Sequence, residues 1–460
     1  MRMRAATGVC VAVLVAAGAA AAASVDATAV TERRVSRLEG PQTNPTITVD
    51  PRDDRILLAG SNSVFEGAQR IYSSTDGGET WKTQTTFQPP VNVAERCAAD
   101  PGVAIDMTGR QYYSFDIASP CRAEGPYRVY VITRPDAESA WSKPILVAPL
   151  AGARLDDKPT IAVDNTPSSP HFKRVYVAWA RLTRRASFRV MISHSDDGGK
   201  TWSKAVRVSR TAQELNYATI GISRTGAVYV AWTDGTNFGI RIARSTDGGR
   251  TFGKEHEVAA FTIVTIPHCG SGIVIPALPR GCLQAAPTVV VDTSTGPYSG
   301  RVYVSYTGTH FRGNQGTALT TFTPTLRPLS GYPVDRRSRI VAPSPEGVFA
   351  DQFWPQPAID RSTGTLWICH YDTRGDKARK RARYSCTLSR DGGRTFAPPV
   401  AIASVPSDAT QPGAIRQYGY YQGLAVANGV AHPIWTDTRD LPSHAEEIYA
   451  ARVTEAAFAR

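Results

Sequence analysis

Seven short apolar runs recur along the chain, and each ends in Asp or another small polar residue. Their last residues stand at positions 50, 106, 164, 223, 292, 360 and 428, a spacing of roughly 55 to 70 residues. A second run follows each one, as in Arg174-Val175-Tyr176-Val177-Ala178-Trp179. Short apolar runs rich in β-branched and aromatic residues, bounded by turn residues, are typical of strands. The pattern therefore predicts seven repeats built from short β-strands.

Four of these repeats contain a nearly identical turn between two strands. The turns read Ser74-Thr75-Asp76-Gly77-Gly78-Glu79-Thr80-Trp81, Ser195-Asp196-Asp197-Gly198-Gly199-Lys200-Thr201-Trp202, Ser245-Thr246-Asp247-Gly248-Gly249-Arg250-Thr251-Phe252 and Ser389-Arg390-Asp391-Gly392-Gly393-Arg394-Thr395-Phe396. The glycines permit the positive φ of a tight hairpin, and the Asp carboxylate can accept N–H groups of its own turn. The second repeat keeps only Asp136 and Trp141, and the fifth, near Thr317 to Arg339, has no such turn. We expect the turn aspartates Asp76, Asp197, Asp247 and Asp391 to be structural.

The four turns resemble the Asp-box (BNR) repeat of sialidase-like β-propellers. The resemblance implies an all-β ring whose blades each hold four antiparallel strands. Seven repeats predict seven blades; six blades, usual for true sialidases, are the alternative. The seventh repeat stops after its third strand, around Glu447 to Val453, and the segment from Thr31 to Arg37 is predicted to supply the missing strand and close the ring.

The first 23 residues have the features of a secretory signal peptide. Arg2 and Arg4 precede an apolar run from Val9 to Ala23, which ends in three alanines before Ser24. The run is too short and too rich in alanine for a good membrane span. We therefore expect a secreted protein without stable membrane insertion, in which residues 24–460 form a single propeller domain.

Six cysteines remain after that segment, and an even number in an exported chain indicates disulfides. Local pairing is predicted: Cys97 with Cys121, Cys269 with Cys282, and Cys369 with Cys386. No C-x-x-C spacing occurs and the eight histidines are scattered, so no metal site of that kind is expected. No cofactor is expected either, although a structural calcium ion in the channel is left open.

The composition is basic, with 52 Lys and Arg against 40 Asp and Glu, a formal net charge of +12. Such a charge favours an anionic glycan or cell-surface polymer as partner, although a generally basic secreted protein would look the same. No basic-aromatic motif supports nucleic-acid binding. A monomer is expected.

Loops that lead into the first strand of a blade and loops that leave its second strand share one face of a propeller. Polar residues gather in these loops: Arg96, Asp100, Arg154, Asp156, Asp157, Lys158, Asn216, Tyr217, Gln284, Asp351, Gln352, Trp354, Arg416, Tyr418, Tyr420, Tyr421 and Gln422 before first strands, and Asp116, Arg181, Asp234, Asp372, Arg374, Asp437 and Arg439 after second strands. Arginine forks bind carboxylates, and a crowded carboxylate can serve as a general acid. The Asp-box turns should lie on the opposite face.

By resemblance to sialidases, this face implies specific roles. Asp351 or Asp157 would be the general acid/base and Tyr421 the nucleophile, as in the tyrosine exceptions among glycosidases. Arg96, Arg374 and Arg439 would hold a substrate anion, with Asp372, Asp437, Tyr420, Gln422 and Trp354 as further substrate contacts. Three structural alternatives stay open: the two Asp-Thr-Arg segments as local ion pairs, Asp156-Asp157 as a loop end, and the tyrosines as channel packing.

One departure from the family concerns its Arg-Ile-Pro motif. Here Ile266-Pro267 follows Thr265 and Ile275-Pro276 follows Val274, so neither has the arginine. The sequence predicts a secreted sialidase-like glycoside hydrolase that acts on glycans, acidic glycans among them. A non-catalytic glycan- or protein-binding propeller and a polysaccharide lyase are the alternatives, because a fold does not fix a function.

Overall fold

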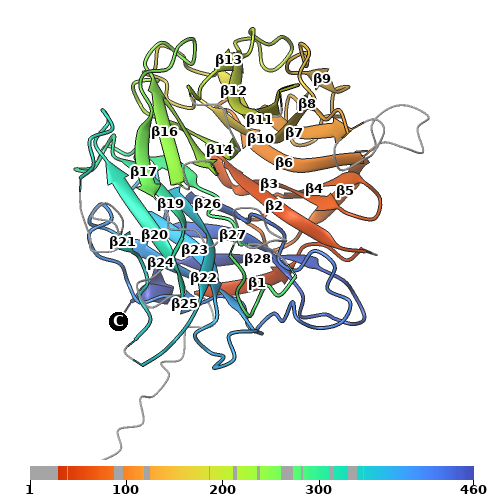
Figure 1. Cartoon of the computed structure of the whole chain (residues 1–460), viewed down its shortest axis with the longest axis vertical. Coiled ribbons are helices and arrows are strands. Elements are labelled where there is room, and N and C mark those ends of the chain that lie inside the picture. The colour runs from red at the N-terminus through yellow and green to blue at the C-terminus, as the bar shows by residue number, and fades with distance from the viewer. Residues whose placement is uncertain are drawn as a thin grey trace, which may run out of the picture.

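The strands form seven four-stranded antiparallel sheets, arranged as the blades of a β-propeller around a central channel (Figure 1). The computed structural model describes residues 29–38, 40–87, 97–118, 125–185, 187–210, 215–235, 239–260, 273–280, 283–309, 314–329, 339–345 and 347–459. The prediction of seven blades is confirmed, and the six-bladed alternative is wrong. Within the described ranges the one helical element is a short 3-10 turn, η1 (Glu455–Phe458), and no helix there is long and apolar enough to cross a membrane.

Six of the blades run outward from the channel in chain order, and the seventh ends on β1. The first four blades are β2 (Gln42–Asp50), β3 (Asp53–Ser63), β4 (Ala68–Ser74) and β5 (Lys82–Phe87); β6 (Cys97–Ile105), β7 (Gln111–Ala118), β8 (Arg128–Arg134) and β9 (Ile145–Leu146); β10 (Leu155–Val163), β11 (Val175–Leu182), β12 (Phe188–Ser195) and β13 (Val206–Arg207); and β14 (Leu215–Ile222), β15 (Val228–Asp234), β16 (Gly239–Ser245) and β17 (His256–Ala260). The fifth and sixth are β18 (Thr288–Val291), β19 (Val302–Thr309), β20 (Gln315–Phe322) and β21 (Arg339–Ile340); and β22 (Gln352–Ile359), β23 (Leu366–Asp372), β24 (Arg383–Ser389) and β25 (Val400–Ala401). The seventh is β26 (Gly423–Ala427), β27 (Val430–Asp437), β28 (Glu447–Thr454) and β1 (Val30–Arg34).

The seventh blade joins the two ends of the chain. Strand β1 pairs antiparallel with β28, with Val30 opposite Val453 and Arg34 opposite Tyr449. An ion pair of 2.6 Å between Arg34 and Glu447 fastens the same junction. The predicted closing strand is thus confirmed; it begins one residue earlier than expected and ends at Arg34. Closing the ring leaves the last blade with four strands.

The apolar residues of the second strands form the centre of each sheet. Four of these strands carry a fully buried tryptophan: Trp179, Trp232, Trp367 and Trp435. Because both faces of a blade pack against neighbouring blades, these strands are apolar on both sides, and each large aromatic side chain contributes a large buried area. The core is therefore divided into layers between blades.

The Asp-box turns lie between the third and fourth strands, on the face opposite the loops that precede the first strands. In the fourth blade, Asp247 Oδ1 accepts bonds from Ser245 Oγ (2.7 Å) and from the N–H groups of Arg250 (3.0 Å) and Thr251 (2.9 Å). The turn also contacts the preceding blade, since Arg174 Nη1 donates to the Gly248 carbonyl at 3.0 Å. The turn thus holds its hairpin together and links neighbouring blades.

The cysteine predictions are met where the residues are described. Cys369 and Cys386 form a disulfide between the paired strands β23 and β24. Cys97 is also disulfide-bonded. Its predicted partner Cys121, the other predicted pair Cys269 and Cys282, and the predicted signal peptide lie outside the described residues.

Candidate functional site

The first strands of five blades share an irregularity near the point where they begin. The strand register shifts by one residue there, and the residue at the shift has a positive φ: 55° at Asn44, 55° at Asp100, 53° at Lys158, 52° at Tyr217 and 50° at Trp354. Side chains with a Cβ rarely adopt this conformation, which costs about 1–3 kcal/mol. The same strained position in blade after blade marks one end of the channel as the candidate site.

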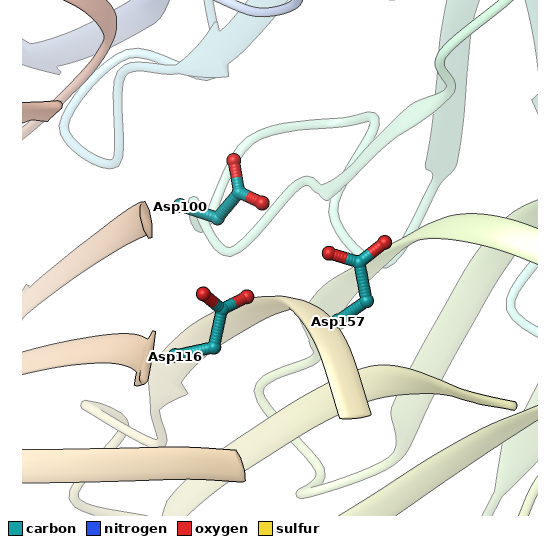
Figure 2. Close-up of side chains that lie close together, drawn as sticks. All are labelled: Asp100, Asp116 and Asp157. Atoms are coloured by element: carbon teal, nitrogen blue, oxygen red, sulfur yellow. The ribbon is translucent and has the colours of Figure 1, made fainter. Parts of the chain in front are cut away.

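Three carboxylates meet at this end, from Asp100 on β6, Asp116 on β7 and Asp157 on β10 (Figure 2). One oxygen from each lies within 4.8 Å of the others. Asp100 and Asp116 are buried, whereas the Asp157 side chain remains 26% exposed. Burial, together with the charges of Asp100 and Asp157, raises the pKa of Asp116 well above its ordinary value. Burial also raises the pKa of Asp157, Asp100 adds to the rise, and Lys158 opposes it. A raised carboxyl pKa favours a proton donor.

Lys158 is the cation of this cluster. Its Nζ lies 3.7 Å from Asp100 Oδ2 and 3.6 Å from Asp157 Oδ2. The ammonium also stands 5.4 Å from the ring centre of Tyr217 and 5.7 Å from that of Tyr420, within the range of cation–π attraction. Burial works against the charged amine, but Asp157 and Asp100 hold the pKa of Lys158 well above its ordinary value. The aspartate oxygens are donors of the kind Ca²⁺ prefers, and Lys158 already places a positive charge against two of them.

Tyr421 reaches the cluster from the seventh blade. Its hydroxyl donates to Asp100 Oδ1 at 3.1 Å, and Asn44 Nδ2 donates to the same oxygen at 3.2 Å. The backbone N–H of Asp100 in turn donates to Asn62 Oδ1 at 2.9 Å. Burial and the neighbouring Asp100 charge raise the pKa of Tyr421 well above 10. The hydroxyl is therefore neutral at physiological pH, with a carboxylate positioned to take its proton.

A cavity of about 200 Å³ occupies the channel beside this cluster. Lys158, Tyr217 and Tyr421 line it together with the first-strand residues below them. All seven blades contribute: Thr46, Gly102, Thr160, Thr219, Thr288, Gln356 and Gln422. The site therefore lies on the axis of the ring, where every blade can present a side chain.

Of the two predicted acid/base residues, the structure brings Asp157 into the cluster but not Asp351. Asp351 is buried; its Oδ1 accepts the Gln315 N–H at 2.9 Å and its Oδ2 lies 3.3 Å from Arg379 Nη1. Its backbone N–H donates to Thr373 Oγ1 at 2.8 Å. No hydrogen bond or ion pair between described residues joins it to the aspartate cluster. Asp351 thus joins the fifth and sixth blades.

Both Asp-Thr-Arg segments form ion pairs within the same turn. Arg374 Nη2 lies 2.7 Å from Asp372, and Arg439 Nη2 lies 2.7 Å from Asp437. Arg439 also forms an ion pair of 2.7 Å with Glu32, which lies in the closing strand β1. Both guanidiniums are thus engaged by protein carboxylates, which fits the local ion-pair alternative. The third predicted anion ligand, Arg96, lies outside the described residues.

The remaining predicted substrate contacts divide into two groups. Trp354 is buried and packs edge-on against Phe353 and Tyr371, in the core between blades. Gln422 is also buried, although it lines the cavity, and bonds to Tyr418 O (2.7 Å) and the Thr436 N–H (2.8 Å). Tyr420 is 38% exposed beside Lys158. Of these three side chains, Tyr420 is the exposed one.

Asp100, Asp116 and Lys158 were placed on this face by the sequence but given no role, and Asn44 was not singled out. A signal existed. In four blades the strained residue directly precedes proline: Asn44-Pro45, Asp100-Pro101, Lys158-Pro159 and Trp354-Pro355. A residue before proline is restricted in its backbone, so the repeated dipeptide at the start of first strands marked the position.

Comparisons with known proteins agree with this architecture. Residues 23–262 match the family of BNR repeat-like domains, and no curated protein matches the chain. Among solved structures, the Hadza microbial sialidase Hz136 is similar with a TM-score of 0.53 and 12% identity, over 91% of this chain and 66% of its own. A protein of unknown function from Dyadobacter fermentans (TM-score 0.50, 12% identity, 93% and 99% covered) and a Trypanosoma rangeli sialidase (0.50, 12%, 92% and 56%) are also similar.

This chain thus spans just under two thirds of the Hadza sialidase and about half of the trypanosomal sialidase. At 12% identity these likenesses show the fold alone. The family match covers more than half of the chain, and the four Asp boxes and seven blades agree with it. The chain belongs to the BNR repeat-like domain family and has a sialidase-like β-propeller fold.

Proposed function

We propose that this protein is an exported retaining glycoside hydrolase that cleaves glycans at the channel mouth. The observation that carries the proposal is the contact between the Tyr421 hydroxyl and Asp100, beside the carboxyl of Asp157, whose pKa is raised by burial. Glycosidases that retain configuration place two carboxyl groups about 5 Å apart, and sialidases replace the carboxylate nucleophile by tyrosine. Here Tyr421 would take the place of the nucleophile, and its hydrogen-bond partner Asp100 lies in the same cluster as Asp157.

The proposed reaction has two steps. In the first, Tyr421 Oη bonds to the anomeric carbon while its proton passes to Asp100, and the glycosidic C–O bond breaks as Asp157 protonates the leaving oxygen. In the second, Asp157 takes a proton from water, whose oxygen attacks the anomeric carbon. The Tyr421–carbon bond breaks and the tyrosine regains its proton from Asp100. Lys158, close to Asp100 and Asp157, favours the anionic form of each when it acts as a base.

The substrate class follows from the charges. Sialidases hold the sugar carboxylate with three arginines. The charged groups of this cluster, among the described residues, are three aspartates and one lysine, and Lys158 is already held by two of the aspartates. That arrangement favours a glycan without a carboxylate at the reacting ring over a sialoside. It also disfavours the lyase alternative, which needs a cation free to neutralise a uronate.

The test uses the chain from Ser24 onward with fluorogenic glycosides of neutral sugars, amino sugars and sialic acid. Turnover is expected, falling about 10²-fold or more in Tyr421→Phe and in Asp157→Asn. Tyr298→Phe is the matched control, because that hydroxyl contacts Arg394 in an Asp-box turn, and it should keep full activity. Retained activity in Tyr421→Phe would refute the mechanism. Glycan binding without any turnover would replace it by the recognition alternative.

A further inference from the structure

The channel has a second mouth on the face that carries the Asp-box turns. First strands run from the aspartate cluster to this face, where a cavity of about 880 Å³ opens. Every blade lines it, through Arg52, Met107, Asn165, Arg224, Thr293, Arg361 and Asn428 among others. Strand ends and the turns that follow them form its walls, so its residues are separate from the proposed catalytic groups.

Two arginines in this cavity have spare hydrogen-bond donors. Arg361 extends from the sixth blade to the third, where its Nη2 donates to the Asn165 carbonyl at 3.0 Å. Arg224 extends from the fourth blade to the fifth, where its Nη1 donates to the Ser294 carbonyl at 3.1 Å. Neither forms an ion pair with a carboxylate in the part of the chain that the structure describes. Each guanidinium has five N–H groups, and one of the five is bonded to a protein acceptor within the described residues.

Both guanidinium groups belong to residues that line the same cavity, and their like charges repel. Burial lowers the pKa of Arg361, the Arg224 charge lowers it further, and Asp164 partly opposes both. An anion that contacts both guanidinium groups would relieve this repulsion.

The other charged groups of the cavity are already engaged. Arg52 pairs with Asp50 at 2.8 Å, and Asp53 pairs with Arg55 at 2.8 Å. Asp360 accepts the N–H groups of Ser362 (2.8 Å) and Gly429 (2.5 Å). Asp54 accepts a bond of 3.0 Å from Asn428. Arg224 and Arg361 are therefore the cations of the cavity that have no carboxylate partner among the described residues.

We propose that this cavity binds an acidic sugar, whose sulfate or carboxylate group is held between Arg224 and Arg361. Arginine forks match the planar, two-oxygen edge of such groups. The volume of the cavity leaves space for the sugar ring beside the anionic group. This site would attach the propeller to an acidic polysaccharide on one face while the other face carries the proposed chemistry.

Isothermal titration with inorganic sulfate, glucuronic acid and glucose tests the proposal. Wild-type protein should bind sulfate and glucuronic acid but not glucose. Binding of sulfate without binding of glucuronic acid would indicate a free anion as the ligand and would overturn the sugar assignment. Arg224→Gln and Arg361→Gln should each weaken glucuronic acid binding about tenfold or more. Arg184→Gln is the control of equal charge change, since Arg184 is exposed on a loop outside the cavity.

Arg361→Lys keeps the charge but loses the fork, and it should bind more weakly than wild type with an unchanged melting temperature. Equal binding by wild type and the Arg224→Gln/Arg361→Gln double variant, or equal binding of glucose, would overturn the proposal. Glycoside turnover should be the same in these variants as in wild type. A failure here is therefore distinguishable from a failure of the proposed catalytic site.

Discussion

Replacing one Asp-box aspartate, Asp247→Asn, should lower stability by an amount that follows from its contacts. Asp247 accepts four hydrogen bonds, from Ser245 Oγ, Thr251 Oγ1 and two backbone N–H groups. Burial alone would raise the pKa of this carboxyl, but bonds from Thr251 and Ser245 prevail and lower it to about 2, from 3.8. At about 1.4 kcal/mol for each pKa unit this corresponds to about 2 kcal/mol. Partial exposure reduces the expected loss to about 1–2 kcal/mol.

The stabilisation by Asp247 should depend on pH. The folded pKa lies below the unfolded value, so the contribution is complete above pH 4–5 and is lost as the pH falls toward 2. At pH 3 about half of the difference between wild type and variant should remain.

Thermal unfolding at pH 7 and pH 3 measures the effect, which for a chain of this length is about 1–2 °C at pH 7. Thr246→Ala, an exposed neighbour in the same turn, is the control and should change the melting temperature little. A loss that is independent of pH, or equal in the control, would refute the argument.

Three further predictions concern buried groups. Burial raises the pKa of Asp116 in the folded state. The folded state therefore loses stability as the pH rises above the pKa of an aspartate in the unfolded chain. Thermal unfolding over a pH series should show that Asp116→Asn raises the melting temperature more at pH 8 than at pH 4. Glu446 is buried, and one of its oxygens accepts the N–H groups of residues 415–417 at 2.5–2.7 Å. Glu446→Gln should therefore lower the free energy of unfolding by about 1–3 kcal/mol, measured in urea. An unchanged free energy would show that the loop of residues 415–417 does not depend on this carboxylate. Trp367→Ala removes a fully buried ring that packs edge-on against Phe458 and should cost about 3–5 kcal/mol in the same assay, whereas a loss below 1 kcal/mol would contradict its place in the core.

The sequence by itself determined the architecture. The periodic apolar runs, the four Asp boxes and the short seventh repeat led to seven blades and to a closing strand near Val30. These features are readable because each is local: alternation, turn chemistry and the spacing of repeats act over a few residues or recur at a fixed interval. Pairing Cys369 with Cys386 followed from the same logic, since their strands are neighbours in one blade.

The composition of the site was decided by the tertiary structure. Asp100, Asp157 and Tyr421 come from three blades and meet because their loops reach the same axis. Asp351 follows a similar loop, yet Arg379 and the Gln315 N–H engage its carboxylate elsewhere. A one-residue bulge at the start of a first strand turns its side chain. Contacts with loops and with neighbouring blades then determine which carboxylates remain for chemistry.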